Sequence, residues 1–308
     1  MTPIHHNTAN GMPSQDALII PDWNVSESLV ESSGADINLC WTCGTCDNGC
    51  PVNISTSRLH PQRNVRMAIY GMRDELLSMP DIWYCLSCRQ CLQGCPNHVR
   101  PYELHQHLRM EAISRGFLPV DFINAYRKLF SQFQRVRWRA AAYCFKEELG
   151  AISDNTWYSW LRTPFRKTAF NIIKLNNHLK NAEKPKHLLD AKSQLCFTCS
   201  ECSGCCPIMG DRDVFDPKKI IRMVNLGLLE NILHSPAIWL CLGCRRCSDM
   251  CSQTVRGYAI IQQLKQLAID RGIVDPFLPI RLLEADRIIY PKFLDEIDAL
   301  FGLYKLKV

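Results

Sequence analysis

Apolar residues recur every three or four positions in two parts of the chain, between residues 61 and 72 and between residues 217 and 228. This spacing predicts helices, because residues three and four apart lie on the same face of a helix. The recurring positions are Val65, Ala68, Ile69 and Met72 in the first part and Ile221, Val224 and Leu228 in the second. No stretch of any length alternates apolar and polar residues as a half-buried strand does. The pattern therefore predicts a mainly α-helical fold.

Proline and glycine indicate where these two helices begin and bend. Pro61 and Pro217 suit the first helical position, and Asp216 suits the N-cap before the second proline. Gly71 and Gly227 lie inside the apolar pattern and indicate a bend or close packing in each stretch.

The chain contains two versions of one segment. Moving residues 40–116 by 156 positions aligns them with residues 196–272 without a gap, and 29 of the 77 positions are identical. Eight of these identities are cysteines, so 21 lie outside the cysteines. Each version is predicted to end in a helix, near 101–115 and 257–271, that stops at an Arg-Gly pair. The repeat predicts a tandem of two modules.

Sixteen of the 18 cysteines fall in four runs with the spacing Cys-x2-Cys-x2-Cys-x3-Cys, two runs in each module. Three runs are followed by proline, whereas the last is followed by Ser252. This spacing with its closing proline is typical of bacterial ferredoxins that bind [4Fe–4S] clusters. We therefore expect four [4Fe–4S] clusters and a role in electron transfer.

In two-cluster ferredoxins the fourth cysteine of a run binds the neighbouring cluster, so we assign the ligands crosswise within each module. Cluster one takes Cys40, Cys43, Cys46 and Cys95; cluster two takes Cys85, Cys88, Cys91 and Cys50; cluster three takes Cys196, Cys199, Cys202 and Cys251; cluster four takes Cys241, Cys244, Cys247 and Cys206. Cys206 is preferred to the adjacent Cys205, because the position equivalent to Cys205 in the first module is Gly49. Cys205 and the isolated Cys144 are interpreted as small apolar residues, with a reactive role as the alternative for Cys205.

Two other uses of cysteine fit less well. Structural zinc sites prefer two Cys-x2-Cys pairs separated by a longer stretch, whereas here a third cysteine follows at once. Disulfides are favoured in secreted proteins, and residues 1–39 contain no Lys or Arg and no long apolar core that would resemble a secretory signal. We therefore expect reduced thiols in a cytoplasmic protein.

Four residues outside the cysteines are candidates for cofactor binding. Trp83 and Trp239 each precede a cluster cysteine by two positions and are expected to cover a cluster and exclude water, with ordinary core packing as the alternative. Arg89 and Arg245 occupy equivalent positions inside a run. They are expected to raise the reduction potential of a cluster, with a solvated surface role as the alternative.

Residues 217–228, followed by residues 238–247, resemble the C subunit of heterodisulfide reductase, and residues 40–116 carry the same pattern more loosely. The resemblance implies two tandem α-helical ferredoxin-like dicluster domains that relay electrons. The implied partners are other subunits of a redox complex, either heterodisulfide-reductase-like A and B subunits or flavoprotein subunits. The alternative is a peripheral iron–sulfur subunit of a membrane quinone-linked oxidoreductase, with a quinone or haem subunit as partner at the inner face of the membrane.

Two differences from this family affect the interpretation. The family's C subunit usually has one dicluster module, whereas this chain has two. Disulfide chemistry in the family belongs to a partner with Cys-Cys-Gly motifs, whereas this chain has Cys205-Cys206-Pro207. The chain also has neither a Gly-x-Gly-x-x-Gly motif nor a P-loop. We therefore expect no catalytic residue here.

Composition divides the chain into five parts. These are a flexible N-terminal arm (1–35), module 1 (36–118), a basic and aromatic helical connector (119–190), module 2 (191–274) and a C-terminal helical extension (275–308). No stretch reaches the roughly 18 apolar residues of a membrane span. The connector is interpreted as helices that pack the two modules together, with docking to an acidic partner subunit or a membrane surface as the alternative. No known nucleic-acid-binding module is recognised, so no nucleic-acid partner is expected.

Overall fold

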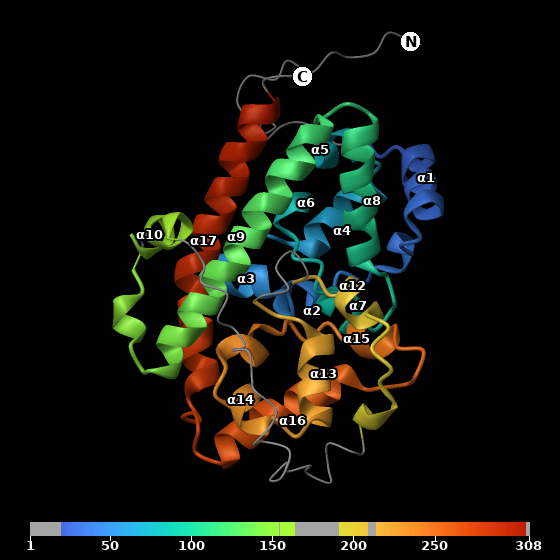
Figure 1. Cartoon of the computed structure of the whole chain (residues 1–308). Helices are drawn as coiled ribbons and strands as arrows, with labels where there is room; N and C mark the ends of the chain where they lie inside the picture. Colours follow the sequence, from blue (N-terminus) through green and yellow to red (C-terminus); the bar gives the residue numbers. More distant parts are fainter. Residues whose placement is uncertain (1–19, 154, 164–190, 209–213, 306–308) are drawn as a thin grey trace.

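The regular structure is helical throughout the described residues of the computed structural model, which are 20–153, 155–163, 191–208 and 214–305 (Figure 1). The remaining parts of the predicted arm, connector and extension lie outside these ranges. The predicted fold class, mainly α with two tandem dicluster domains joined by a helical linker, is confirmed.

Module 1 consists of short helices between cysteine loops and one longer closing helix. Its elements are η1 (Ile37–Leu39), α2 (Thr45–Asn48), α3 (Pro51–Thr56), α4 (Pro61–Ile69), α5 (Arg73–Leu77), α6 (Asp81–Tyr84), α7 (Gln90–Gln93) and α8 (Pro101–Ser114). Module 2 repeats this order with η5 (Ser193–Leu195), α12 (Glu201–Gly204), α13 (Pro217–Asn225), α14 (Leu229–Leu233), η6 (Pro236–Leu240), α15 (Arg246–Asp249) and α16 (Gly257–Asp270). The equivalent elements have nearly the same bounds after the shift of 156 positions.

The helix predicted over 61–72 is interrupted at its glycine. α4 ends at Ile69, Gly71 has φ +73°, and α5 begins two residues later. A Cβ atom at Gly71 would stand 2.3 Å from the carbonyl oxygen of Asp22. Both the predicted bend and the predicted close packing are therefore present, and both require glycine at this position.

The predicted helix starts are also present. Pro61 and Pro217 occupy the first turn of α4 and α13. The Asp216 carboxylate accepts a hydrogen bond from the Lys218 amide at 2.9 Å, as expected for an N-cap. His60 precedes Pro61 without such a side-chain bond.

Two long helices lie side by side and antiparallel across both modules: α9 (Val120–Phe145, green) and α17 (Leu278–Lys305, red) (Figure 1). The rings of Phe133 and Phe293 stack between them with centroids 4.0 Å apart. α9 contacts η6 of module 2, whereas α17 returns to α3 and α6 of module 1. The short elements η2 (Leu149–Ala151) and α10 (Thr156–Arg162) follow α9. One continuous apolar core therefore joins the modules to this helix pair.

The predicted arm contains a helix where it is described. α1 (Trp23–Ser33) begins at an Asp22 N-cap and packs against α8 and α4 of module 1. Arg73 ties it to the module through a hydrogen bond to the Ser28 hydroxyl at 2.9 Å. This packing places residues 23–33, which belong to the predicted arm, against module 1.

Candidate metal centres

The four cysteine loops follow the same backbone path. In each run, the residue two positions after the first cysteine and the residue four positions after it have positive φ angles between 56° and 78°. These residues are Thr42 and Gly44, Ser87 and Arg89, Thr198 and Ser200, and Gly243 and Arg245. Only two of the eight are glycine, and left-handed backbone at the others is disfavoured and typical of functional loops. The alternation curls each loop around the space that its cysteines face.

A helix of one turn follows each curled loop and carries the third cysteine of the run. These helices are α2, α7, α12 and α15, and each has four residues. They position the third sulfur and lead the chain to the fourth cysteine. The curled loop with its one-turn helix is therefore the unit that is repeated four times.

The cysteines assigned to clusters one and three line separate cavities. Cys40, Cys43, Cys46 and Cys95 surround one cavity of about 350 Å³. Cys196, Cys199, Cys202 and Cys251 surround another of about 370 Å³. Cys43 and Cys199 are exposed, and Trp41 and Phe197 beside them are 77% and 58% exposed. These two sets lie at the surface, and we call them the outer sites.

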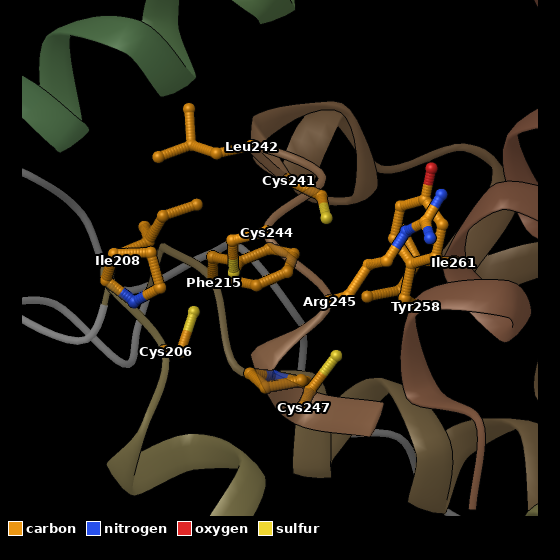
Figure 2. Close-up of a pocket in the computed structure, with 12 residues that line it drawn as sticks. Cys206, Ile208, Phe215, Cys241, Leu242, Cys244, Arg245, Cys247, Tyr258 and Ile261 are labelled. Atoms are coloured by element: carbon orange, nitrogen blue, oxygen red, sulfur yellow. The ribbon is translucent and has the colours of Figure 1, made fainter. Parts of the chain in front are cut away.

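The cysteines assigned to clusters two and four lie deeper, and we call these sets the inner sites. The sulfur atoms of Cys206, Cys241, Cys244 and Cys247 face a common cavity of about 330 Å³ (Figure 2). Cys85, Cys88, Cys91 and Cys50 are all buried. Burial, followed by the charges of Cys85, Cys88 and Cys50, raises the pKa of Cys91, as expected for four thiols that lie near one another.

The donor set fits a multi-iron cluster. Four thiols around one cavity can supply one thiolate to each iron of a [4Fe–4S] cluster. Within the described part of the chain, no three His, Cys, Asp or Glu side chains stand close enough to hold a single metal ion. Backbone amides also point at the sulfurs: those of Ser87 and Val99 donate to Cys85 and Cys95, each at 3.4 Å.

Burial raises the pKa of half of the sixteen thiols. Burial, followed by the charges of Asp47 and Cys40, raises the pKa of Cys46 to about 12. Burial also raises the pKa of Cys50 to about 12. Cys43 shows the opposite shift, because the Thr45 hydroxyl at 3.3 Å lowers the pKa of this exposed thiol. A metal ligand must be a thiolate, so cluster binding at the buried cysteines has to release protons.

The inner runs of the two modules face each other. Gln90 and Gln93 of module 1 donate hydrogen bonds to the carbonyl oxygens of Leu242 and Cys244 at 2.7 and 2.8 Å. Cys244 also acts electrostatically on Cys88, its equivalent in module 1. The two inner sites are therefore neighbours across the contact between the modules.

Arg245, one of the two arginines expected to raise a reduction potential, lines the cavity of the second inner site. It lies at the edge of that cavity with its guanidinium 5.2 Å from the Tyr258 ring centroid (Figure 2). Arg89 instead spans the contact between the modules and lies 3.7 Å from the Asp249 carboxylate. Trp83 and Trp239 are buried and are absent from the linings of the three cavities described above. Trp83 packs edge-on against Phe122, with centroids 4.6 Å apart. Their role as cluster covers stays a prediction.

Our sequence analysis missed several charged residues beside the cysteines. Arg109 donates to the carbonyl oxygen of Cys85 at 2.5 Å, and Lys265 occupies the equivalent position in module 2. The repeat alignment pairs these two cations and so contained a usable signal. Arg137 on α9 lies outside the repeat and reaches Leu240, the residue before Cys241, at 3.4 Å. No sequence pattern indicated that contact.

The two cysteines outside the assigned sets differ in environment. Cys144 is buried on α9, and its thiol donates to the Arg281 carbonyl oxygen at 3.6 Å. Cys205 is half-buried, and its thiol donates to the Cys202 carbonyl oxygen at 3.5 Å.

Comparison with known proteins identifies two 4Fe-4S dicluster domains. One protein-family description of a 4Fe-4S dicluster domain matches residues 35–99, and a second matches residues 195–256. Each match contains two of the cysteine runs.

The curated relatives include C subunits of heterodisulfide reductases. The C subunit of the H2:CoB-CoM heterodisulfide, ferredoxin reductase of Methanothermobacter thermautotrophicus is 33% identical over 107 residues, which cover 34% of this chain and 57% of the relative. The second iron–sulfur C subunit of the CoB–CoM heterodisulfide reductase of Methanocaldococcus jannaschii is 36% identical over 77 residues, or 25% of this chain and 40% of the relative. An Archaeoglobus profundus protein named for its likeness to the heterodisulfide reductase C subunit is 32% identical over 86 residues, or 28% of this chain and 46% of the relative. The matches thus span about half of each relative.

None of the helices in the described ranges is both long and apolar enough to cross a membrane. The helical fold, the four curled cysteine loops and the two matching domain descriptions agree with one another. The chain contains two segments that match 4Fe-4S dicluster domains, and it is similar to the C subunit of heterodisulfide reductase.

Proposed function

We propose that this chain is the electron-transfer subunit of a heterodisulfide-reductase-like complex and binds four [4Fe–4S] clusters, two in each module. The observation that carries the proposal is the convergence of sixteen cysteines on four sites, three of them around separate cavities. When bound, each [4Fe–4S] cluster exchanges one electron. The five-part division of the chain, with modules at 36–118 and 191–274, is part of this proposal.

The crosswise ligand assignment is supported by which cysteines share a cavity. Cys95 lies with Cys40, Cys43 and Cys46 rather than with the earlier cysteines of its own run. In module 2, Cys251 lies with the first three cysteines of the other run, and Cys206 likewise lies with the first three cysteines of the run that ends in Cys251. This exchange links the two runs of each module, so that neither loop can move away without losing a ligand.

The order of the sites supports a linear path. Cys46 of the first outer site acts electrostatically on Cys91 of the first inner site. Cys244 of the second inner site acts electrostatically on Cys88 of the first inner site. Cys247 of the second inner site also lines the second outer cavity. The sites therefore follow the order one, two, four, three. Electrons would enter at one outer site and leave at the other.

The exposed outer sites suit partners that carry their own redox groups. The proposed partners are a flavin or iron–sulfur donor subunit at one end and an acceptor subunit at the other, in the cytoplasm. The relatives named above are heterodisulfide reductase subunits. We therefore favour this class over a quinone-linked membrane complex.

Metal analysis of anaerobically prepared protein tests the proposal. Four clusters require about sixteen iron and sixteen acid-labile sulfide per chain. Zinc without sulfide, or about eight iron, would reject it. Co-purification from the native source would then identify the partners, and recovery with a haem or quinone protein would favour the quinone-linked class instead.

A further inference from the structure

The inner and outer sites are flanked by charges of opposite sign in both modules. At the first inner site, Arg109 donates from Nη2 to the Cys85 carbonyl oxygen at 2.5 Å and from Nε to the Ile82 carbonyl oxygen at 2.7 Å. These two bonds hold the guanidinium against the first cysteine of the inner run. Arg109 is half-buried and lies 5.4 Å from the Trp83 ring centroid, so its charge is held between that ring and the loop.

Lys265 provides the same charge at the second inner site. Its ammonium lies 5.5 Å from the Trp239 ring centroid, as Arg109 lies over Trp83. Trp239 precedes Cys241 by two residues, as Trp83 precedes Cys85. Each inner site therefore has a cation over the tryptophan that precedes the first cysteine of its run.

A second cation reaches the same site from α9. Arg137 is buried, donates to the Leu240 carbonyl oxygen at 3.4 Å, and is influenced by the charge of Cys241. The Asp286 carboxylate lies 3.7 Å from its Nε atom and partly balances this charge. Arg245 adds a further positive charge at the cavity edge.

The outer sites have carboxylates instead. Asp47 Oδ1 lies 3.8 Å from the Cys46 sulfur at the first outer site. At the second outer site, Asp216 Oδ1 accepts a hydrogen bond at 2.5 Å from the hydroxyl of Ser203, the residue after Cys202. Cys202 is the equivalent of Cys46. Lys218 and the exposed Glu201 also line the second outer cavity, but their charges are opposite.

Charge placement determines which site holds an added electron more strongly. Reduction makes a cluster more negative, so a nearby cation raises its potential and a nearby carboxylate lowers it. Burial alone would oppose reduction at the inner sites, because water stabilises added charge. The same burial strengthens the effect of each cation, since the interaction between two charges grows as the effective dielectric constant falls.

We propose that the two inner clusters have higher reduction potentials than the two outer clusters, with Arg109 and Lys265 as the residues that raise the inner potentials. This inference rests on the proposed function, because it requires clusters at all four sites. It gives the chain a further property, which is storage of two electrons at its centre. A flavin hydroquinone could then pass one electron to each inner cluster while releasing its two protons to water. The acceptor subunit would then receive these electrons from the inner clusters one at a time.

Potentiometric titration followed by electron paramagnetic resonance tests this inference in the full chain. We expect R109Q and K265Q each to lower one of the two highest-potential steps. The ratio of reduced to oxidised cluster at a fixed potential should fall about tenfold, which is about 59 mV for one electron. D47N and D216N should each raise one of the two lowest-potential steps. R109K and K265R keep the positive charge and should leave the steps nearly in place.

Iron and sulfide content separates failure of this inference from failure of the proposed function. Too little iron and sulfide in the unsubstituted protein would reject the four clusters themselves. R109Q and K265Q could instead keep their full cluster content while the two highest-potential reduction steps stay in place or the two lowest-potential steps move. That result would overturn this inference but leave the proposed function intact. Loss of the two backbone hydrogen bonds could unfold R109Q. K265Q then decides the question, because Lys265 lies over an indole ring at the equivalent position.

Discussion

The two modules share a fold, and one buried pair of side chains shows how their packing differs. In module 1, Asn64 Nδ2 and His105 Nε2 are 3.1 Å apart between α4 and α8. In module 2 the equivalent positions are Ile220 and Ile261 on α13 and α16. All four side chains are at most 1% exposed. The same pair of helices thus packs around a polar contact in one module and an apolar contact in the other.

The modules also place a carboxylate at the same point in space from different positions in sequence. In module 1, Asp47 accepts a hydrogen bond from the Gln62 amide at 2.7 Å. In module 2, Asp216 accepts from the equivalent Lys218 amide at 2.9 Å, and Ser203 replaces Asp47. The helix start therefore requires a carboxylate near its second amide, whichever residue supplies it. Contacts between residues, rather than individual residues, are shared between the modules.

The largest expected effect comes from the crossing ligands, which both modules should share. Cys95→Ser should remove cluster one, and Cys251→Ser should remove cluster three, because serine is a poor ligand for a cluster iron. Each variant should retain about twelve of about sixteen irons per chain. Cys205→Ser is the matched control and should retain all of them. Spectroscopic loss of an inner cluster in Cys95→Ser would contradict the crosswise assignment.

The helical fold could be predicted from the apolar spacing, and the grouping of the cysteines around shared cavities could be predicted because their spacing is strict and occurs twice in each module. The backbone path of the loops could not, since six of the eight left-handed positions are not glycine. Ser87 and Arg89 adopt positive φ only because the loop must curl around a cavity. The sequence carries no local sign of such tertiary constraints.

Charge around the sites was predictable only where the repeat preserves it. Arg109 and Lys265 align in the two modules, so a comparison of charges between the modules would have singled them out. Asp47 and Asp216 do not align, because module 1 supplies its carboxylate from α2 and module 2 supplies its carboxylate from the N-cap of α13. Arg137 depends on how α9 packs on module 2. The last two cases required the three-dimensional structure.

The second prediction concerns substitutions that replace the buried Asn64–His105 pair of module 1 by the isoleucine pair of module 2. His105→Ile alone should lower the free energy of unfolding by about 1–3 kcal/mol, because it leaves the Asn64 amide buried without its partner. The double variant Asn64→Ile/His105→Ile should recover most of this loss, since replacing both polar partners by apolar groups is often neutral or stabilising. Asn64 Oδ1 and His105 Nδ1 are buried without a hydrogen-bond partner, which favours that outcome. Chemical denaturation under anaerobic conditions measures the unfolding free energy of both variants. A double variant less stable than His105→Ile would contradict the prediction.

The third prediction concerns pH, because only module 1 buries a titratable group at this position. Burial, together with the positive charge of Arg109, lowers the pKa of His105 from 6.5 to about 3. The unfolded chain binds a proton near pH 6.5 whereas the folded chain does not, so stability is present above pH 6.5 and is lost as pH falls. The loss should be about 1.4 kcal/mol per pH unit below pH 6.5. Between pH 7.5 and pH 5.5, the unfolding free energy of the natural chain should fall by about 1.4 kcal/mol more than that of the double isoleucine variant. Equal slopes in both proteins would reject the assignment to His105.

The smallest expected effect comes from moving the helix-capping carboxylate. Asp47→Ser should cost about 1 kcal/mol of unfolding free energy, because the Gln62 amide loses its charged acceptor. Adding His60→Asp should recover it, since position 60 is the equivalent of Asp216 and the serine introduced at position 47 would then match Ser203. In module 2 the Ser203 hydroxyl donates to Asp216 Oδ1 at 2.5 Å, so the double variant recreates an arrangement already present in this chain. Asp47→Ser/His60→Ala is the matched control and should stay destabilised. If Asp47→Ser/His60→Asp is no more stable than this control, a carboxylate near the helix start is not sufficient to restore the lost stability. The two modules would then be equivalent in backbone but not in local electrostatics.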